Sequence, residues 1–454
     1  MITKHCRQRT QLAITLFTLN EIYDCKLSKQ TANYMVMSHL EQLRFLNTED
    51  IKGVIGQWGT SVFVYDEAIM QQQVQQALAF SAPFGLTVRY AMKANPNSNI
   101  LRMFSSMGVA IDAGSGWEAD RALRAGIDPK DILITGQELP KNLVELVEKG
   151  VQFNACSLHQ LQEYGAKFPG TNVSIRINPG LGSGHSKKTN VGGSASSFGI
   201  WHEYIDKLND IATEHKLNIN RLHTHIGSGS DPAVWMKAAK ISLEQVRTLP
   251  NVTILNLGGG FKVALTQGEA QTKLSEISSV VADALQTFYD ETGRKIRLEI
   301  EPGTFLIANA GSLITTIHDI VDTGYDGYTF LKIDSGMTEI LRPTLYGAQH
   351  PLVVVTDGSE DEQYIVAGHC CESGDILTPD PDQPDMLKTR LLKKASRGDV
   401  LVIEGVGAYC AAMSAINYNS FPRSPEVVKK IDGSLVEIAR RQTLEEMLQL
   451  EAQM

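Results

Sequence analysis

The sequence predicts a (β/α)8 TIM-like barrel followed by a C-terminal all-β domain, either a sandwich or a barrel, and three observations support this class. Eight short apolar runs alternate with segments of helical periodicity. Several of these runs end in a polar residue, where the parallel strands of α/β folds carry chemistry. From about Gly311 onward, β-like runs follow one another without regular helical interruptions. We expect a partly helical extension at 1–57, the barrel at 58–310, and a β-rich domain with a closing helix at 311–454.

The predicted barrel strands are short and mostly apolar. They are 86–92, 109–112, 132–136, 151–155, 173–178, 222–227, 254–258 and 297–301. The segments between them have apolar positions three and four residues apart, most clearly at 117–125, 139–149, 158–168, 200–215 and 234–249. Strands that are covered by helices outside and by packed side chains inside are apolar throughout. The polar residues at their carboxyl ends therefore indicate function.

The β-rich domain is predicted from apolar runs separated by turn signals such as Asp-Gly and Pro-Asp. These runs are 312–317, 328–333, 352–355, 364–367 and 400–403. An earlier run, 61–65, is a predicted strand and a candidate for the same domain. The tail, 444–450, is predicted to form the closing helix.

The composition is that of a large soluble enzyme. The chain has 454 residues, of which 43% are hydrophobic and 20% charged, enough for one large core and a second smaller one. Its net charge of -9, without a long basic run, argues against nucleic acid as a partner. Six scattered cysteines, none in a CxxC pair, favour a reducing cytoplasm and predict neither a disulfide framework nor a metal site. No signal peptide or membrane span is expected, because the apolar run 12–19 lacks a cleavage site and no longer run exists.

Lys93 is the residue whose position is most informative. It ends the apolar strand that includes Tyr90 and is followed at once by Asn95 and Pro96, which stop the strand. A partly desolvated amine at the carboxyl end of a barrel strand forms a Schiff base with a carbonyl group readily. Taken alone, a single lysine is more often a surface residue. The repetition of polar strand ends along the chain favours the functional interpretation.

Six motifs occur in an order that resembles a known family. They are Tyr90-Ala-Met-Lys-Ala-Asn95, His225-Ile-Gly-Ser228, Gly258-Gly-Gly260, Glu301-Pro-Gly303, Cys371-Glu-Ser-Gly-Asp375 and Gly407-Ala-Tyr409. The chain resembles the pyridoxal-phosphate decarboxylases of the alanine-racemase-like fold over roughly residues 58 to 430. Within them it is similar to the diaminopimelate decarboxylases and, more distantly, to the ornithine decarboxylases. Each motif alone is weak evidence for the family, whereas all six in this order are strong evidence.

The resemblance implies that the chain binds pyridoxal 5'-phosphate. This cofactor needs an amine for its aldehyde and a carboxylate at its ring nitrogen, and the matching residues are Lys93 and Glu301. Its phosphate needs backbone N–H groups that no Cβ obstructs. The other positions that match the family's cofactor site are Asp112, Arg176, His225, Ser228, Gly258, Gly259, Gly260 and Tyr409. Glu118 also matches, whereas His223 has a weaker case.

From residue types alone, each of these assignments has a structural alternative. His225 could be a core histidine with satisfied hydrogen bonds. Asp112 and Arg176 could form a polar layer inside the barrel. The glycine triplet could be a tight turn. The adjacent Cys370 and Cys371 could both be buried thiols.

The same resemblance implies a homodimer with shared active sites, in which Cys371 and Glu372 enter from the other subunit. Cys371 would be the acid that protonates the product carbon, and Glu372 would receive the distal ammonium. Arg342 and Tyr346 match positions that bind the distal end of the substrate, where an arginine suits a carboxylate. The clearest departure from the family is Thr304, which follows Glu-Pro-Gly where the diaminopimelate decarboxylases typically have arginine.

The expected activity is therefore a cytoplasmic lyase reaction of lysine biosynthesis, the decarboxylation of meso-diaminopimelate to L-lysine. Its substrate is a small amino acid, and neither nucleic acid nor membrane is an expected partner. Three alternatives stay open: a related decarboxylase acting on another diamino acid or a carboxylated polyamine, a homologue that binds without turnover, and an amino-acid racemase. Lys93, Glu301 and Cys371 together argue against the second. The racemase is disfavoured because no second catalytic base is found.

Overall fold

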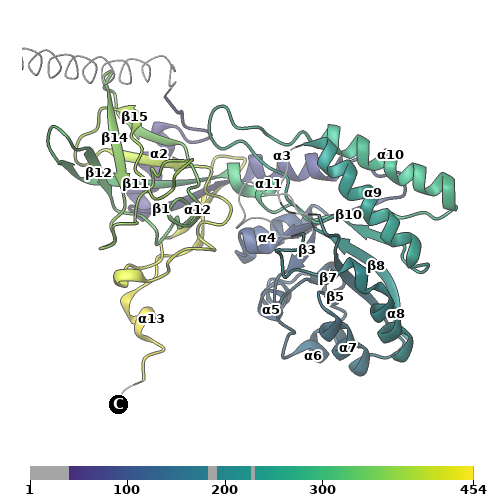
Figure 1. Ribbon diagram of the computed structural model, residues 1–454. Coiled ribbons are helices and arrows are strands. Elements are labelled where there is room, and N and C mark those ends of the chain that lie inside the picture. Colours follow the sequence, from purple (N-terminus) through teal and green to yellow (C-terminus); the bar gives the residue numbers. More distant parts are fainter. Residues whose placement is uncertain (1–39, 182–191, 226, 228–230, 453–454) are drawn as a thin grey trace, which may run out of the picture. The chain divides into compact units, whose positions relative to one another are not determined.

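The computed structural model describes residues 40–181, 192–225, 227 and 231–452 (Figure 1). Eight of its strands form one closed ring in which every neighbouring pair is parallel. They are β2 (Leu86–Ala91), β3 (Ala110–Ala113), β4 (Ile132–Ile134), β5 (Gln152–Ala155), β6 (Asn172–Asn178), β8 (Asn218–Thr224), β9 (Ile254–Asn256) and β10 (Arg297–Ile300). The two-residue strand β7 (Ile200–Trp201) pairs with β6 outside the ring. The predicted (β/α)8 barrel is confirmed.

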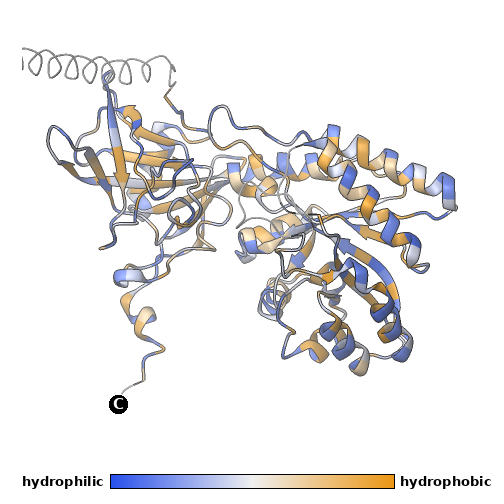
Figure 2. Ribbon diagram, in the orientation of Figure 1, coloured by the Kyte–Doolittle hydropathy of each residue, from blue (hydrophilic) through white to orange (hydrophobic). Residues whose placement is uncertain are grey.

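Helices precede or follow the strands of the ring and lie outside it (Figure 1). They are α3 (Glu67–Leu78), α4 (Ser98–Ser106), α5 (Gly116–Arg124), α6 (Leu143–Glu148), α7 (Leu158–Lys167), α8 (Ile205–Glu214), α9 (Pro232–Thr248) and α10 (Leu274–Thr292). Short 3-10 turns are η1 (Met92–Ala94), η2 (Pro129–Asp131), η4 (His202–Tyr204), η5 (Ala308–Ala310) and η6 (Tyr418–Ser420). Figure 2 shows helices that are hydrophobic on one side and hydrophilic on the other, the pattern of a layer that packs on a core.

Local sequence explains where these helices begin and end. Ser115 and Ser157 cap α5 and α7, because each side chain accepts a hydrogen bond from a backbone N–H of the first turn. Helix α10 ends at Gly293, which has a left-handed φ of 71°. Its buried positions, among them Ile277, Val281 and Phe288, recur at helical spacing.

The remaining strands form a mixed nine-stranded sheet. They are β1 (Val62–Asp66), β11 (Gly311–Asp322), β12 (Thr329–Ile333), β13 (Leu352–Val355), β14 (Asp361–Ala367), β15 (Arg390–Lys393), β16 (Val400–Glu404), β17 (Glu426–Lys429) and β18 (Leu435–Ala439). Three short helices accompany it: α11 (Thr304–Ile307), α12 (Arg342–Tyr346) and the closing α13 (Leu444–Leu448). The predicted β-rich domain is therefore present, with strands 390–393, 426–429 and 435–439 in addition to those expected.

One strand of this sheet, β1, precedes the barrel in the sequence. Strand β1 pairs antiparallel with β11 and parallel with β17, although it lies inside the range 58–310 expected for the barrel. Helix α2 (Thr48–Trp58) buries Ile51 and Val54 against Val62 and Ile314, so part of the expected extension belongs to the core of the same sheet.

Among the described helices, none is long and apolar enough to cross a membrane.

A buried ionic cluster stabilises the interior of the barrel. Glu299 on β10 accepts hydrogen bonds from Arg89 Nη2 at 3.1 Å and from Arg221 Nη2 at 3.2 Å. All three side chains are at least nine-tenths buried. Burial alone would raise the pKa of Glu299, but the two guanidinium groups hold it below its usual value. Glu299 is therefore the counter-charge for two buried cations.

We expect Glu299→Ala to destabilise the barrel strongly, because it leaves two buried guanidinium groups without their anion. Removing one partner of a buried ion pair typically costs about 3–5 kcal/mol. Urea unfolding followed by far-UV circular dichroism measures the loss. The matched control is Glu145→Ala, which breaks the exposed pair with Lys149 and should leave the midpoint nearly unchanged. Equal effects of the two substitutions would contradict the assignment.

Candidate active site

Lys93 lies in the 3-10 turn η1, directly after β2. The turn is held in place because Tyr90 donates its hydroxyl to the carbonyl of Asn95 at 3.1 Å. The backbone N–H of Tyr409, which comes from the β-rich domain, donates to the carbonyl of Ala94 at 2.8 Å. These contacts hold the turn that contains Lys93 and bring the β-rich domain to the carboxyl end of β2.

The charges around Lys93 favour its ammonium form. Its side chain is solvent-accessible at the end of the barrel. Desolvation by neighbouring atoms lowers the pKa of Lys93, but Tyr409 and Asp112 outweigh this effect, so the pKa lies above its usual value. Glu301 acts in the same direction and Arg176 against it. Five of the predicted site residues therefore meet at one end of the barrel.

Glu301, directly after β10, is the most strongly perturbed carboxyl group of this cluster. Burial, followed by the charge of Asp112, raises the pKa of Glu301 to about 8. Asn256 Nδ2 donates to Glu301 Oε1 at 2.6 Å, and His223 Nε2 lies 3.4 Å from Glu301 Oε2. Burial, first, and nearby cations hold the pKa of His223 well below its usual range, so the imidazole is neutral. A buried carboxyl group in this state fits a cationic partner such as a protonated ring nitrogen.

The glycine turn after β9 is packed too closely for any side chain. At Gly258, which has φ of +70°, a Cβ atom would come within 2.6 Å of His225 Nδ1. At Gly259 a Cβ atom would collide with the carbonyl oxygen of Glu301. The N–H of Gly258 donates to Asn256 Oδ1 at 2.8 Å. This turn therefore presents bare backbone next to Glu301, as the binding of a phosphate requires.

Buried polar atoms without partners line the same region. Among the described residues, Asp112 Oδ1 and His225 Nδ1 have no hydrogen-bond partner. Buried polar groups are nearly always paired, so such atoms indicate a polar ligand. The Arg176 guanidinium lies 5.0 Å from the centre of the Phe198 ring, which supports it from one side. Glu118, which the resemblance also indicated, accepts from the N–H of Gly114 at 2.6 Å.

The other predicted residues lie elsewhere or outside the described part of the chain. Ser228 is among the residues that the structure does not describe. Arg342 begins α12, and its Nη1 atom is buried without a partner among the described residues, whereas Tyr346 at the end of that helix is exposed. Cys371 and Glu372 are exposed on the loop after β14. Cys371 donates its backbone N–H to Asn419 Oδ1 at 2.8 Å, within the β-rich domain.

Two asparagines complete the cluster and were not predicted. Asn154 on β5 lies 2.7 Å from His223 Nδ1 through its Nδ2 atom and accepts from Ser174 at 2.8 Å. Asn256 on β9 joins Glu301 to the glycine turn. The sequence contained a signal for both, because each asparagine interrupts a buried apolar strand near its carboxyl end.

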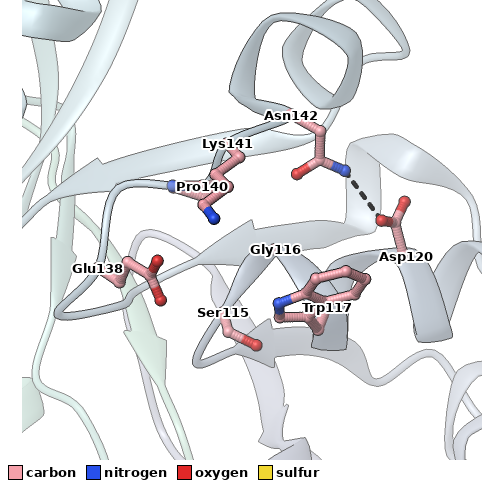
Figure 3. A pocket seen from close by; sticks show the side chains of 8 residues that line it. All are labelled: Ser115, Gly116, Trp117, Asp120, Glu138, Pro140, Lys141 and Asn142. Carbon is pink, nitrogen blue, oxygen red and sulfur yellow. Dashed lines mark hydrogen bonds between the residues drawn. The ribbon is translucent and has the colours of Figure 1, made fainter. Parts of the chain in front are cut away.

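A separate surface pocket of about 240 Å³ lies between the first turns of α5 and the loop that follows β4 (Figure 3). It is lined by Ser115, Gly116, Trp117, Asp120, Glu138, Pro140, Lys141 and Asn142. Asn142 donates to Asp120 at 2.9 Å, and Trp117 is 81% exposed. Its lining includes no residue of the Lys93 cluster.

Comparisons with known proteins agree with this geometry. Residues 68–308 match the family model described as "Pyridoxal-dependent decarboxylase, pyridoxal binding domain". The chain is 36% identical over 418 residues to a diaminopimelate decarboxylase of Escherichia coli strain K12, covering 89% of this chain and 97% of that protein. It is also 36% identical to a diaminopimelate decarboxylase of Streptomyces coelicolor, covering 86% of this chain and 89% of the relative.

The chain is also similar to solved structures of diaminopimelate decarboxylases. A crystal structure of diaminopimelate decarboxylase superposes with a TM-score of 0.82 at 35% identity, covering 88% of this chain and 95% of the other. The Helicobacter pylori diaminopimelate decarboxylase complexed with L-lysine superposes with a TM-score of 0.79 at 26% identity, covering 88% and 98%.

The raised pKa of Glu301 predicts a pH dependence of stability in the cofactor-free protein. An unfolded glutamate titrates near 4.3, so between about pH 4.3 and 8 the unfolded chain has lost a proton that the folded protein keeps. Stability therefore falls as the pH rises through this window, and Glu301→Gln should reduce that fall. Urea midpoints at pH 5, 6, 7 and 8 measure it, with Glu145→Gln as an exposed control. Parallel curves for the wild type and Glu301→Gln would refute the assignment.

Proposed function

The chain belongs to the pyridoxal-dependent decarboxylases, and within them to the diaminopimelate decarboxylase family; on this premise we propose that it removes the α-carboxylate of meso-diaminopimelate to yield L-lysine. The observation that carries the proposal is the meeting of Lys93 and the buried Glu301 beside the glycine turn. A reducing, cytoplasmic setting is part of the proposal, since the four cysteines in the described residues are free thiols.

The residues of the cluster fit pyridoxal phosphate. This group, when bound, supplies a ring that withdraws the electron pair left behind as carbon dioxide departs. Lys93 would hold its aldehyde end, the glycine turn its phosphate, and Glu301 its ring nitrogen. Asn256 restrains both the carboxylate and the turn, because its amide donates to Glu301 and accepts from Gly258. The neutral His223 beside Glu301 brings no competing positive charge.

Specificity for a second carboxylate is assigned to Arg342. Its Nη1 atom is buried and has no hydrogen-bond partner in the part of the chain that the structure describes, and a planar guanidinium holds a carboxylate through two hydrogen bonds. Thr304 at the start of α11 supplies a hydroxyl group where the family's typical arginine would supply a charge. Arg342 then carries the recognition of the distal carboxylate with help from Tyr346.

We further propose a homodimer in which each active site is completed by Cys371 and Glu372 of the other copy. Both residues are exposed, and the contacts of this loop are with its own β-rich domain. In this arrangement Cys371 delivers the proton to the product carbon, and Glu372 receives the distal ammonium.

The shared-site proposal predicts recovery of activity on mixing two defective proteins. Lys93→Ala should lose turnover by several orders of magnitude, and Cys371→Ala should be strongly impaired. After subunit exchange, half of the dimers combine the two chains and contain one intact site, so about a quarter of wild-type activity should return. The control pair is Lys93→Ala with Glu301→Gln, which leaves no intact site in any dimer. Demonstrated exchange without recovery would refute the shared site.

The substrate proposal predicts a large effect of Arg342→Ala on meso-diaminopimelate. Losing a charge-assisted contact costs roughly 1.5–3 kcal/mol, or about ten- to a hundred-fold in kcat/KM. Turnover of lysine or ornithine, which lack the distal carboxylate, should change little. Product identification with meso-diaminopimelate, lysine, ornithine and carboxylated polyamines is the measurement. A wild-type preference for a substrate without that carboxylate would refute the substrate while leaving the family assignment intact.

A further inference from the structure

The loop that carries Cys371 is closed at its base by Asp375. The N–H of Gly368 donates to the carbonyl of Asp375 at 2.8 Å, and an antiparallel bridge joins Ala367 to Ile376. The Asp375 residue is only 3% exposed, although the loop itself lies at the surface. A buried carboxylate under an exposed loop needs a set of hydrogen-bond donors.

Two backbone groups supply these donors. Met337 N–H donates to Asp375 Oδ1 at 2.7 Å, and Cys370 N–H donates to Asp375 Oδ2 at 2.9 Å. The space for the carboxylate exists because Gly336 and Gly368 lack side chains, since a Cβ atom at either position would collide with it. Asp375 therefore ties the cysteine loop to the segment that follows β12.

The two adjacent cysteines differ as a result. The Cys370 thiol hydrogen-bonds to Asp375, and burial together with that carboxylate raises the pKa of Cys370 to about 12. Cys371 is exposed, and its backbone N–H is held on the other side by Asn419. Cys370 is therefore only partly exposed beside Asp375, whereas Cys371 and the following Glu372 are exposed.

We propose that Asp375 is a positioning residue that fixes the cysteine loop, holding Cys370 inward so that Cys371 and Glu372 face outward. The orientation of the thiols is independent of the function. Only the consequence for turnover rests on the function proposed above, in which Cys371 acts in the active site of a second copy.

Asp375→Asn tests the inference, because it keeps the shape of the side chain and turns an NH2 group toward one of the two backbone donors. The folded holoenzyme is treated with iodoacetamide, and the alkylation of each cysteine is followed by peptide mass spectrometry. In the wild type, Cys371 should react and Cys370 should be protected. In the variant, alkylation of Cys370 should rise at least about tenfold and kcat/KM should fall by a similar factor. The affinity for pyridoxal phosphate should not change, because its proposed ligands lie in the barrel.

The matched control is Asp361→Asn, an exposed acid on β14 that pairs with Lys393 at 3.2 Å, for which both readouts should stay at wild-type values. If Asp375→Asn does not fold, Gly368→Ala displaces the same carboxylate without changing it and should give the same alkylation result. A folded variant that keeps Cys370 protected would overturn the positioning role. Exposure of Cys370 without loss of kcat/KM would uphold that role and overturn the proposed action of Cys371.

Discussion

The pairing of β10 with β2 is the contact on which the active site depends. It closes the ring by joining the last barrel strand to the first, with Ile300 opposite Val88. One step beyond this pair, the N–H of Ala91 donates to the carbonyl of Pro302 at 3.3 Å. Residues at opposite ends of the barrel sequence, Lys93 and Glu301, become neighbours for this reason. No local feature of either segment could bring an amine and a carboxyl group together in this way.

Glu299 on β10 and Glu301 directly after it have pKa values that are shifted in opposite directions. Two guanidinium groups hold the pKa of Glu299 below its usual value, whereas burial and the charge of Asp112 raise the pKa of Glu301 to about 8. The charge of Glu299 is balanced by Arg89 and Arg221 within the protein. The opposite shifts support the functional role proposed for Glu301 and a structural role for Glu299.

The parts of the fold that the sequence predicted well are those with strong periodicity. The barrel strands are mostly buried, so most of them are short runs rich in apolar residues, as β2 and β4 are. Strands β15 and β17 were missed because each has only two apolar residues between charged ends, and β18 because Glu437 interrupts it. The strand at 61–65 was visible, but the sheet it joins is decided by contacts with β11 and β17 far along the chain. Likewise, the sequence could not predict which of the adjacent Cys370 and Cys371 faces outward. This depends on a contact between Cys370 and Asp375, five residues further along the chain.

Helix α2 and strand β1 precede the barrel in the sequence but pack in the β-rich domain, and this order affects synthesis on the ribosome. These segments are made before the barrel, yet their partners β11, β16 and β17 emerge only after the whole barrel. During that interval the apolar faces of Ile51, Val54 and Val62 have no sheet to cover them. A nascent chain in this state carries exposed hydrophobic surface and an unpaired strand edge, the features that recruit chaperones and promote aggregation. The barrel is thus an insertion within the β-rich domain, and that domain is the last part of the molecule to be completed.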